Sequence, residues 1–165
     1  REPGGSKNSE KIRKIILKNN SNLNKKTDML LYLAARSENF EKIIMKNHNK
    51  KIILIDRFID STIAYQHYGM GINKNIINVI NKFILGNVKP DITFLNIVNK
   101  KNLIFRLKKR KNKNRYDKFR FSFYNKVQNG FIKLSKRNKK CILINSNKNI
   151  LENKNLIIKK IKNLI

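Results

Sequence analysis

Apolar residues recur at the spacing of one α-helical face in several segments of the chain. The pattern predicts helices over residues 6–19, 27–46, 73–85, 101–109, 116–135 and 150–165. Ser6 and the pair Thr27-Asp28 can cap two of these helices, and Gly86 can terminate another. In residues 116–135 the apolar face is rich in phenylalanine, and we interpret it as core rather than as a cofactor site.

Shorter, continuous apolar runs have the character of strands that are buried on both faces. They predict strands over residues 51–55, 92–98 and 140–144. Because these strands alternate with helices, the expected fold class is α/β, with a parallel sheet flanked by helices. The chain has no internal repeat and no linker rich in proline, glycine or serine, so its 165 residues are expected to form one domain.

An acid and a base, Asp56 and Arg57, stand directly after the first predicted strand. Open α/β sheets bind their ligands at the carboxyl ends of parallel strands. An aspartate there can serve a metal ion or its water shell, and an arginine can bind phosphate. The alternative is that Asp56 caps the next helix and Arg57 is its surface partner. A ligand site is favoured by polar side chains that follow about one helical turn apart and could line a pocket wall: Ser61, Thr62, Tyr65 and Gln66.

The formal net charge of +29 suggests a nucleic-acid partner, since lysine and arginine neutralise phosphates. The lysines, however, are spread through every segment together with asparagine and isoleucine, a mixture typical of AT-rich coding sequence. Only residues 108–115 are dense enough for a basic patch, and they lack interleaved aromatic residues that stack on bases. Nucleic acid is therefore not expected as a partner.

Cysteine content and hydropathy indicate the cellular compartment of the protein and whether it spans a membrane. The single cysteine, Cys141, lies in an apolar run and is interpreted as a small core residue rather than a nucleophile. No apolar stretch approaches the roughly 20 residues that span a bilayer, and no secretory signal is visible. The sequence thus predicts a cytoplasmic protein with no membrane partner.

Several short motifs resemble those of bacterial thymidylate kinase in both order and spacing. They are Arg-Glu-Pro-Gly-Gly-Ser at 1–6, Leu-Ala-Ala-Arg at 33–36, the segment 56–66, Gly-Met-Gly at 69–71, Pro-Asp-Ile-Thr at 90–93 and Asn-Arg-Tyr-Asp at 114–117. The resemblance covers nearly the whole chain and implies a P-loop NTPase-like fold in a single domain over residues 1–165. It also implies a homodimeric enzyme that uses ATP and Mg²⁺ to convert dTMP into dTDP, for dTTP biosynthesis.

The resemblance assigns the acceptor phosphate to Arg57 and Arg1. Asp56 would orient the phosphates through Mg²⁺ or its water, so that its contact with the metal is indirect. Glu2 lies in the same turn as Arg1 and would assist.

For the nucleoside, the resemblance implies that Tyr32 stacks on thymine and that Arg36, one helical turn later, reaches the base carbonyls. Without the resemblance, a core aromatic on an amphipathic helix is the favoured interpretation of Tyr32. The base edge would be bonded by Ser61 or Thr62, and the sugar bracketed by Tyr65 and Gln66.

Residues 106–117 fall where the family has its lid, a mobile loop that closes over ATP. Arg115, with Arg110 as the alternative, would neutralise charge on the transferred phosphoryl group, and Arg106 opens the same basic stretch. A solvated charge run is the competing interpretation. The chain also departs from the family, because Asn114 replaces the lid acid and Asn96 replaces a strand aspartate, and each change removes a negative charge.

The chain contains no Gly-x-x-x-x-Gly-Lys-Ser/Thr loop, the element that cradles ATP phosphates. In the family this P-loop and its strand precede the turn at residues 1–6, and the chain begins with Arg1 rather than Met. We therefore expect the P-loop and the central first strand to be missing from this chain. Strands 51–55 and 92–98 would then have unpaired edges, and the 165-residue chain is expected to be poorly stable and inactive alone.

Three alternatives stay open: a kinase for another nucleoside monophosphate, a basic nucleic-acid-binding protein, and a decayed relative without catalysis. One methyl group separates thymine from uracil, and hydrophobic contact alone discriminates by only about 1 to 3 kcal/mol. Salt-dependent binding to random oligonucleotides would favour the nucleic-acid binder.

Overall fold

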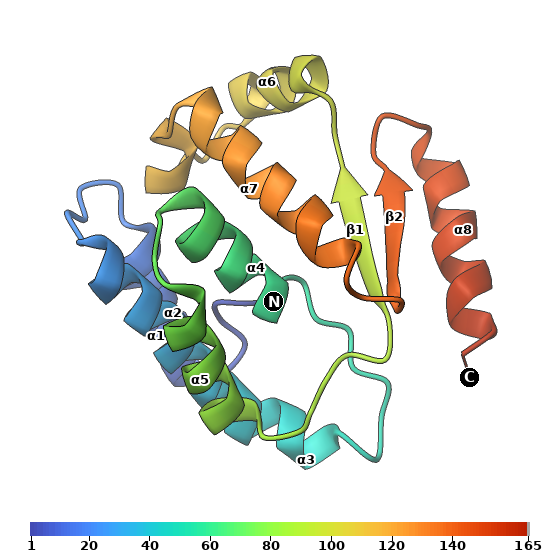
Figure 1. The fold of residues 1–165 in the computed structure, drawn as a ribbon, viewed down its shortest axis with the longest axis horizontal. Helices are drawn as coiled ribbons and strands as arrows, with labels where there is room; N and C mark the ends of the chain where they lie inside the picture. Colours follow the sequence, from blue (N-terminus) through green and yellow to red (C-terminus); the bar gives the residue numbers. More distant parts are fainter. Residues whose placement is uncertain (165) are drawn as a thin grey trace. The chain divides into compact units, whose positions relative to one another are not determined.

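A computed structural model describes residues 1–164 of the chain, and Figure 1 shows their helices and strands. The chain divides into two compact units. The first unit contains Arg1–Lys89 and Lys113–Phe131, and the second contains Pro90–Asn112 and the chain from Ile132 onward. The expectation of one domain is not tested by this division and stays a prediction.

The first unit is built from helices that agree closely with the apolar periodicity. Helix α1 packs against α2, and α2 packs against α5. The helices predicted over residues 6–19, 27–46 and 73–85 are therefore confirmed. The elements of this unit are α1 (Lys7–Leu17), α2 (Lys25–Asn39), the π-helical turn η1 (Phe40–Ile44), α3 (Met45–Asn47), α4 (Ile59–Thr62), the π-helical turn η2 (Ile63–Gly69), α5 (Lys74–Leu85), the 3₁₀ turn η3 (Arg115–Lys118) and the first part of α7 (Phe121–Ser135).

Helix caps explain where these helices begin and end. The Ser6 side chain accepts a hydrogen bond from a backbone N–H of the first turn, as predicted. Helix α2 begins earlier than expected, because Asn24 rather than Thr27-Asp28 supplies its cap. Asp28 is thereby released from capping, and its carboxylate lies in the interior. Gly86 ends α5 with a φ of +56°, a conformation that glycine adopts without strain.

The helix predicted over residues 116–135 is divided into η3 and α7. Asn114 and Asp117 form a capping box that closes η3 as a separate turn, and Phe119 is extended. The apolar face of α7 is core as predicted, since Phe123 and Val127 are buried and pack with Ile16 and Ala64. The break matters because it turns the Tyr116 side chain into this core.

The strand predicted over residues 51–55 is wrong: the segment is extended, but it pairs with no strand in the part of the chain that the structure describes. A strand is stabilised by hydrogen bonds to a neighbour, and the apolar run alone does not supply one. Ile53 and Ile55 pack against the buried cluster of Phe40, Ile44 and Leu85. The alternate residue Leu54 is 81% exposed. Only one face of the segment is therefore covered within residues 1–164.

The second unit carries a parallel pair of strands, β1 (Thr93–Ile97) and β2 (Cys141–Asn145), which lie side by side in Figure 1. Their register runs from Thr93 opposite Cys141 to Ile97 opposite Asn145. Helices α6 (Lys100–Lys109) and α8 (Ile150–Lys162) and the end of α7 complete this unit. The strands predicted near residues 92–98 and 140–144 are confirmed, and helices with a small parallel sheet agree with the expected α/β class. Within residues 1–164, no helix has the length and apolar character to cross a membrane.

Candidate functional site

The turn at residues 1–6 carries Glu2 into the interior of the first unit. Gly4 and Gly5 have φ values of +128° and +109°, which L side chains rarely adopt. A Cβ on Gly5 would also lie 2.4 Å from the Asn39 side-chain oxygen, so the turn requires glycine there. Beyond the turn, the Glu2 N–H donates a 2.8 Å hydrogen bond to the Asp56 carbonyl. This bond joins two motifs that the sequence separates by more than fifty positions.

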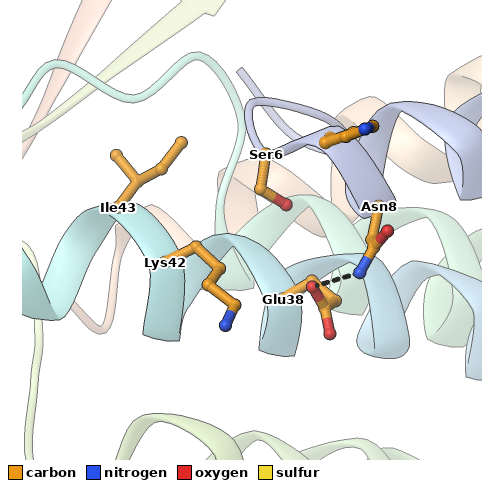
Figure 2. Close-up of a pocket in the computed structure, with 6 residues that line it drawn as sticks. Ser6, Asn8, Glu38, Lys42 and Ile43 are labelled. Carbon is orange, nitrogen blue, oxygen red and sulfur yellow. Dashed lines mark hydrogen bonds between the residues drawn. The ribbon is translucent and has the colours of Figure 1, made fainter.

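An open pocket of about 340 Å³ lies beside this turn (Figure 2). Asn8 donates a 3.0 Å hydrogen bond to Glu38 across its wall. The pocket contains none of the side chains assigned to a substrate from the sequence. Its lining residues are Ser6, Lys7, Asn8, Glu38, Lys42 and Ile43.

Arg36 is the most buried cation of the unit, with only 2% of its surface exposed. Its Nε and Nη2 atoms lie 2.8 and 2.7 Å from Glu2 Oε2, so the charge is paired inside the protein. Its Nη1 atom donates to Asn81 Oδ1 at 2.7 Å, and its guanidinium lies 5.3 Å from the centre of the Phe58 ring. The sequence predicted Arg36 and Glu2 as site residues but missed Asn81, which has no distinguishing motif on α5.

Arg57 has a positive φ of 67°, which is rare for a residue with a branched or long side chain and costs conformational energy. Its guanidinium lies 5.0 Å from the centre of the Tyr65 ring, and Nη2 donates to the Tyr65 hydroxyl at 3.3 Å. Partial burial lowers the pKa of Arg57, but Tyr65, Tyr32 and Asp56 act in the opposite direction and leave it raised. These predicted site residues are therefore close enough to interact electrostatically.

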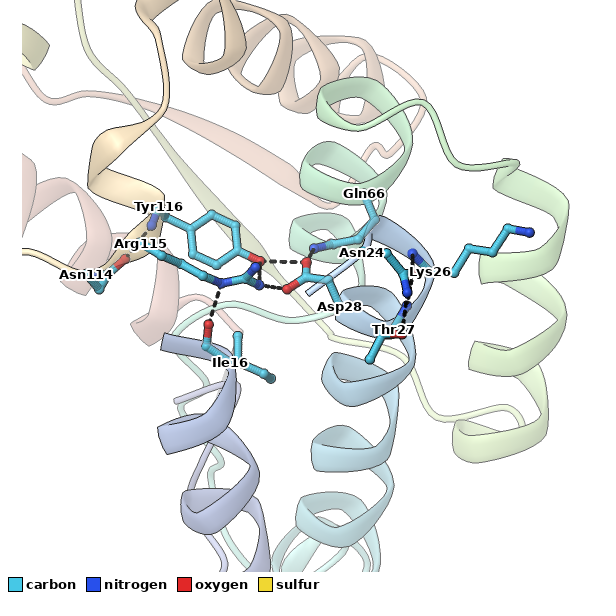
Figure 3. Close-up of polar contacts among 9 residues, drawn as sticks. All are labelled: Ile16, Asn24, Lys26, Thr27, Asp28, Gln66, Asn114, Arg115 and Tyr116. Atoms are coloured by element: carbon cyan, nitrogen blue, oxygen red, sulfur yellow. Dashed lines mark hydrogen bonds and ion pairs between the residues drawn. The ribbon is translucent and has the colours of Figure 1, made fainter. Parts of the chain in front are cut away.

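Asp28 is the centre of a buried polar network that the sequence did not reveal (Figure 3). Its Oδ2 atom accepts hydrogen bonds from Gln66 Nε2 at 3.1 Å and from the Tyr116 hydroxyl at 2.7 Å. Its Oδ1 atom forms an ion pair with Arg115, which also donates to the Ile16 carbonyl. Arg115, predicted at the edge of the lid, is thus held in the first unit by a carboxylate that is only 1% exposed.

Three tyrosines meet edge to face beside this network. The Tyr116 ring centre lies 6.2 Å from that of Tyr32 and 5.8 Å from that of Tyr65. Burial raises the pKa of Tyr32 and of Tyr116, so both hydroxyls stay protonated at neutral pH. Tyr116 thus packs between Tyr32 and Tyr65, the two aromatic residues assigned to the nucleoside. In the sequence, only its position directly after Arg115 distinguishes it from other tyrosines.

The polar side chains of residues 61–66 do not all face the same side. The reason is that helix α4 is followed by the π-helical turn η2 within this stretch, which changes the angular spacing of the side chains. Thr62 and Gln66 are buried, whereas Ser61 and Tyr65 are half-buried. Thr62 Oγ1 has no hydrogen-bond partner within residues 1–164. A buried hydroxyl without a partner is costly, and a bound ligand could satisfy it.

Other predicted residues lie at exposed positions. Asp56 is exposed, and Arg1 is exposed with its guanidinium 3.8 Å from Glu10. Arg106 belongs to the second unit, where it donates a 2.7 Å hydrogen bond to the Ser146 carbonyl, and Arg110 caps the end of α6 in the same unit. The lid roles of these two arginines stay predictions. Among residues 1–164, no three histidine, cysteine, aspartate or glutamate side chains are grouped as a metal site.

The chain is similar to thymidylate kinases in sequence and structure. A family model described as thymidylate kinase matches residues 1–157. A thymidylate kinase of Thermosipho africanus is 41% identical over 152 residues, which are 91% of this chain and 75% of that protein. One from Ehrlichia ruminantium (strain Gardel) is 38% identical, and the match covers 98% of this chain and 80% of that protein. The crystal structure of thymidylate kinase from Ehrlichia chaffeensis has a TM-score of 0.77 at 34% identity and covers 98% of this chain and 78% of that chain.

Proposed function

The chain belongs to the thymidylate kinase family of phosphotransferases, and we propose that its first unit binds dTMP as the acceptor of the ATP γ-phosphoryl group. The product of that transfer is dTDP, a precursor of dTTP. The observation that carries the proposal is the grouping of Arg57, Tyr65 and Tyr32: the Arg57 guanidinium lies 5.0 Å from the centre of the Tyr65 ring, and Tyr65 and Tyr32 both pack edge to face against Tyr116. A nucleoside monophosphate requires this combination of a phosphate ligand and flat apolar surfaces.

Arg57 and Arg1 bind the acceptor phosphate in this proposal. Each charge-assisted hydrogen bond contributes about 1.5 to 3 kcal/mol. The positive φ of Arg57 supports the role, because strained backbone is retained where function needs a fixed side-chain direction. The backbones of Glu2 and Asp56 are joined by a hydrogen bond, so the two motifs lie side by side, and the Glu2 carboxylate is held on Arg36.

The nucleoside lies against Tyr32, whose ring stacks on thymine and contributes about 1 to 3 kcal/mol. Arg36 donates to a base carbonyl. Of the two hydroxyls considered for the base edge, the buried and unpartnered Thr62 is better supported than Ser61. The sugar lies beside Tyr65, and Gln66 is held in place by its bond to Asp28.

Thymidylate kinases use ATP and Mg²⁺. Few residues of this chain are proposed to contact either of them. Mg²⁺ often keeps several waters and one or two carboxylate contacts. Asp56 fits such an indirect, water-mediated contact, since it is exposed and is not part of a group of three ligating side chains within residues 1–164. Bound Mg²⁺ would neutralise phosphate charge. No residue of this chain is assigned to the ATP cradle.

Arg115 is proposed to neutralise charge on the transferred phosphoryl group. That role requires its ion pair with Asp28 to open, because Arg115 has its charge paired there in the structure. Arg110 and Arg106 are proposed as further lid cations. Inactivity of the 165-residue chain without a P-loop, and its cytoplasmic location, stay predictions.

A homodimer is part of the proposal. Helix α5 exposes an apolar stripe of Ile76, Val79 and Phe83 at helical spacing, with Phe83 88% exposed. A second copy of the chain would cover this stripe. Sedimentation of the wild type and of Phe83→Glu checks the assignment, since a dimer that used the stripe would dissociate in the variant.

The test of dTMP binding compares calorimetric titrations of the 165-residue chain with dTMP and with thymidine, which lacks the phosphate. Arg57→Ala should weaken dTMP binding about 10- to 100-fold and leave thymidine binding unchanged. Lys51→Ala removes an exposed cation that lies earlier in the same segment of the chain, and it is the matched control. Equal affinities of Arg57→Ala and wild type for dTMP would refute the proposal.

A further inference from the structure

Asn81 is a buried amide on α5 that no sequence motif connects with a function. Its Oδ1 atom accepts a 2.7 Å hydrogen bond from Arg36 Nη1. Glu2 holds the same guanidinium through Nε and Nη2, at 2.8 and 2.7 Å. Three side chains that come from the first turn, α2 and α5 therefore meet at one buried charge.

The two partners restrict the direction of Arg36. A guanidinium has five N–H donors in a fixed plane. Contacts with Glu2 and Asn81 engage all three nitrogens and leave one further N–H on each terminal nitrogen. Because the side chain cannot rotate without breaking a buried charge-assisted bond, these remaining donors have a defined direction.

The amide orientation of Asn81 follows from the same chemistry. A guanidinium offers only donors, so the Asn81 oxygen must face Arg36 and the NH₂ group must face away. Asn81 Nδ2 is buried and has no hydrogen-bond partner within residues 1–164. An unpaired buried donor is costly, and a ligand carbonyl is the complementary group.

We infer that Asn81 is a positioning residue for base selection, acting through Arg36. The inference rests on the proposed function, in which Arg36 donates to a carbonyl of the base. Thymine has a carbonyl at position 4, whereas cytosine has an amino group there that also donates. The N–H groups of Arg36 that remain unengaged therefore accept dTMP and reject dCMP, and Asn81 keeps these donors fixed.

The experiment measures dissociation constants of dTMP and dCMP by calorimetry on the 165-residue chain. The variant Asn81→Leu has a similar size but no acceptor for Arg36. The ratio of the dCMP constant to the dTMP constant should fall about tenfold, as expected for the loss of one hydrogen bond to a charged group.

Asn78→Leu is the matched control, since Asn78 lies on the same helix and is exposed. An unchanged ratio in folded Asn81→Leu, or the same fall in Asn78→Leu, would overturn the inference. If circular dichroism shows that Asn81→Leu does not fold, Asn81→Ala carries the test with the same expected fall.

Failure of the proposed function would be recognised by a different result in the binding measurements. The wild type would then bind neither nucleotide, or Arg57→Ala would bind dTMP as well as the wild type does. Failure of the inference alone leaves dTMP binding dependent on Arg57, with base selection that is independent of Asn81.

Discussion

Replacement of Asp28 by asparagine should strongly destabilise the first unit while preserving most of its packing. The carboxylate is 1% exposed and is surrounded by donors from Gln66, Tyr116 and Arg115. An asparagine of the same shape can accept hydrogen bonds through its oxygen. Its NH₂ group, however, faces a donor, and the positive charge of Arg115 loses its partner.

The expected magnitude follows from this geometry. Removing one partner of a buried ion pair costs about 3 to 5 kcal/mol, because the other charge stays in a poorly solvated place. The Arg115 side chain is 11% exposed, which permits some hydration and places the expected loss near the lower end, about 3 kcal/mol. That loss is a large part of the roughly 5 to 15 kcal/mol that stabilises a typical domain.

Urea unfolding followed by far-ultraviolet circular dichroism measures the effect. Asp91→Asn is the matched control, because Asp91 is exposed and the substitution removes the same charge. The double variant Asp28→Asn with Arg115→Met should recover part of the lost stability, since it also removes the uncompensated charge. A loss below about 1 kcal/mol for Asp28→Asn would refute the reasoning. A double variant less stable than Asp28→Asn would do so as well.

Three further predictions concern the tyrosine cluster and the glycine turn. Burial raises the pKa of Tyr116, so the folded state keeps its proton where the unfolded chain loses it, and the free energy of unfolding should fall as pH rises above about 10. The fall should be smaller in Tyr116→Phe, and equal slopes would contradict the assignment. Tyr32→Ala should weaken dTMP binding about 5- to 100-fold and Tyr32→Phe much less, as measured by calorimetry; equal losses would argue against stacking. Gly5→Ala should lower the free energy of unfolding by about 1 to 3 kcal/mol in urea titrations, because of its φ of +109° and the contact with Asn39; a neutral effect would show that the turn can relax.

The helices and their ends were largely predictable from local patterns. Apolar spacing located α1, α2 and α5, and Ser6 and Gly86 were correct end signals. These features depend on interactions within a few residues, such as one face of a helix or one cap. The division between η3 and α7 was missed because the side chains of Asn114 and Asp117 compete with the helix for backbone hydrogen bonds.

The candidate site was predicted in part, through motifs that stand in the expected order. Tyr32, Arg57 and Tyr65 do lie near one another, although their roles toward a substrate stay predictions. The surrounding polar network was not foreseen. Asp28 has the sequence context of a helix cap, and Asn81 belongs to no recognisable motif.

The sequence by itself determined most of the helices, the positions of the strands β1 and β2, and the family, because each depends on local spacing or on short motifs in order. Tertiary structure alone decided that residues 51–55 form no paired strand within the described chain, since pairing depends on a neighbour. It also decided that Asp28 meets Arg115 and that Asn81 meets Arg36. These residues are far apart along the chain, and a buried charge selects its partner only when folding excludes water around both.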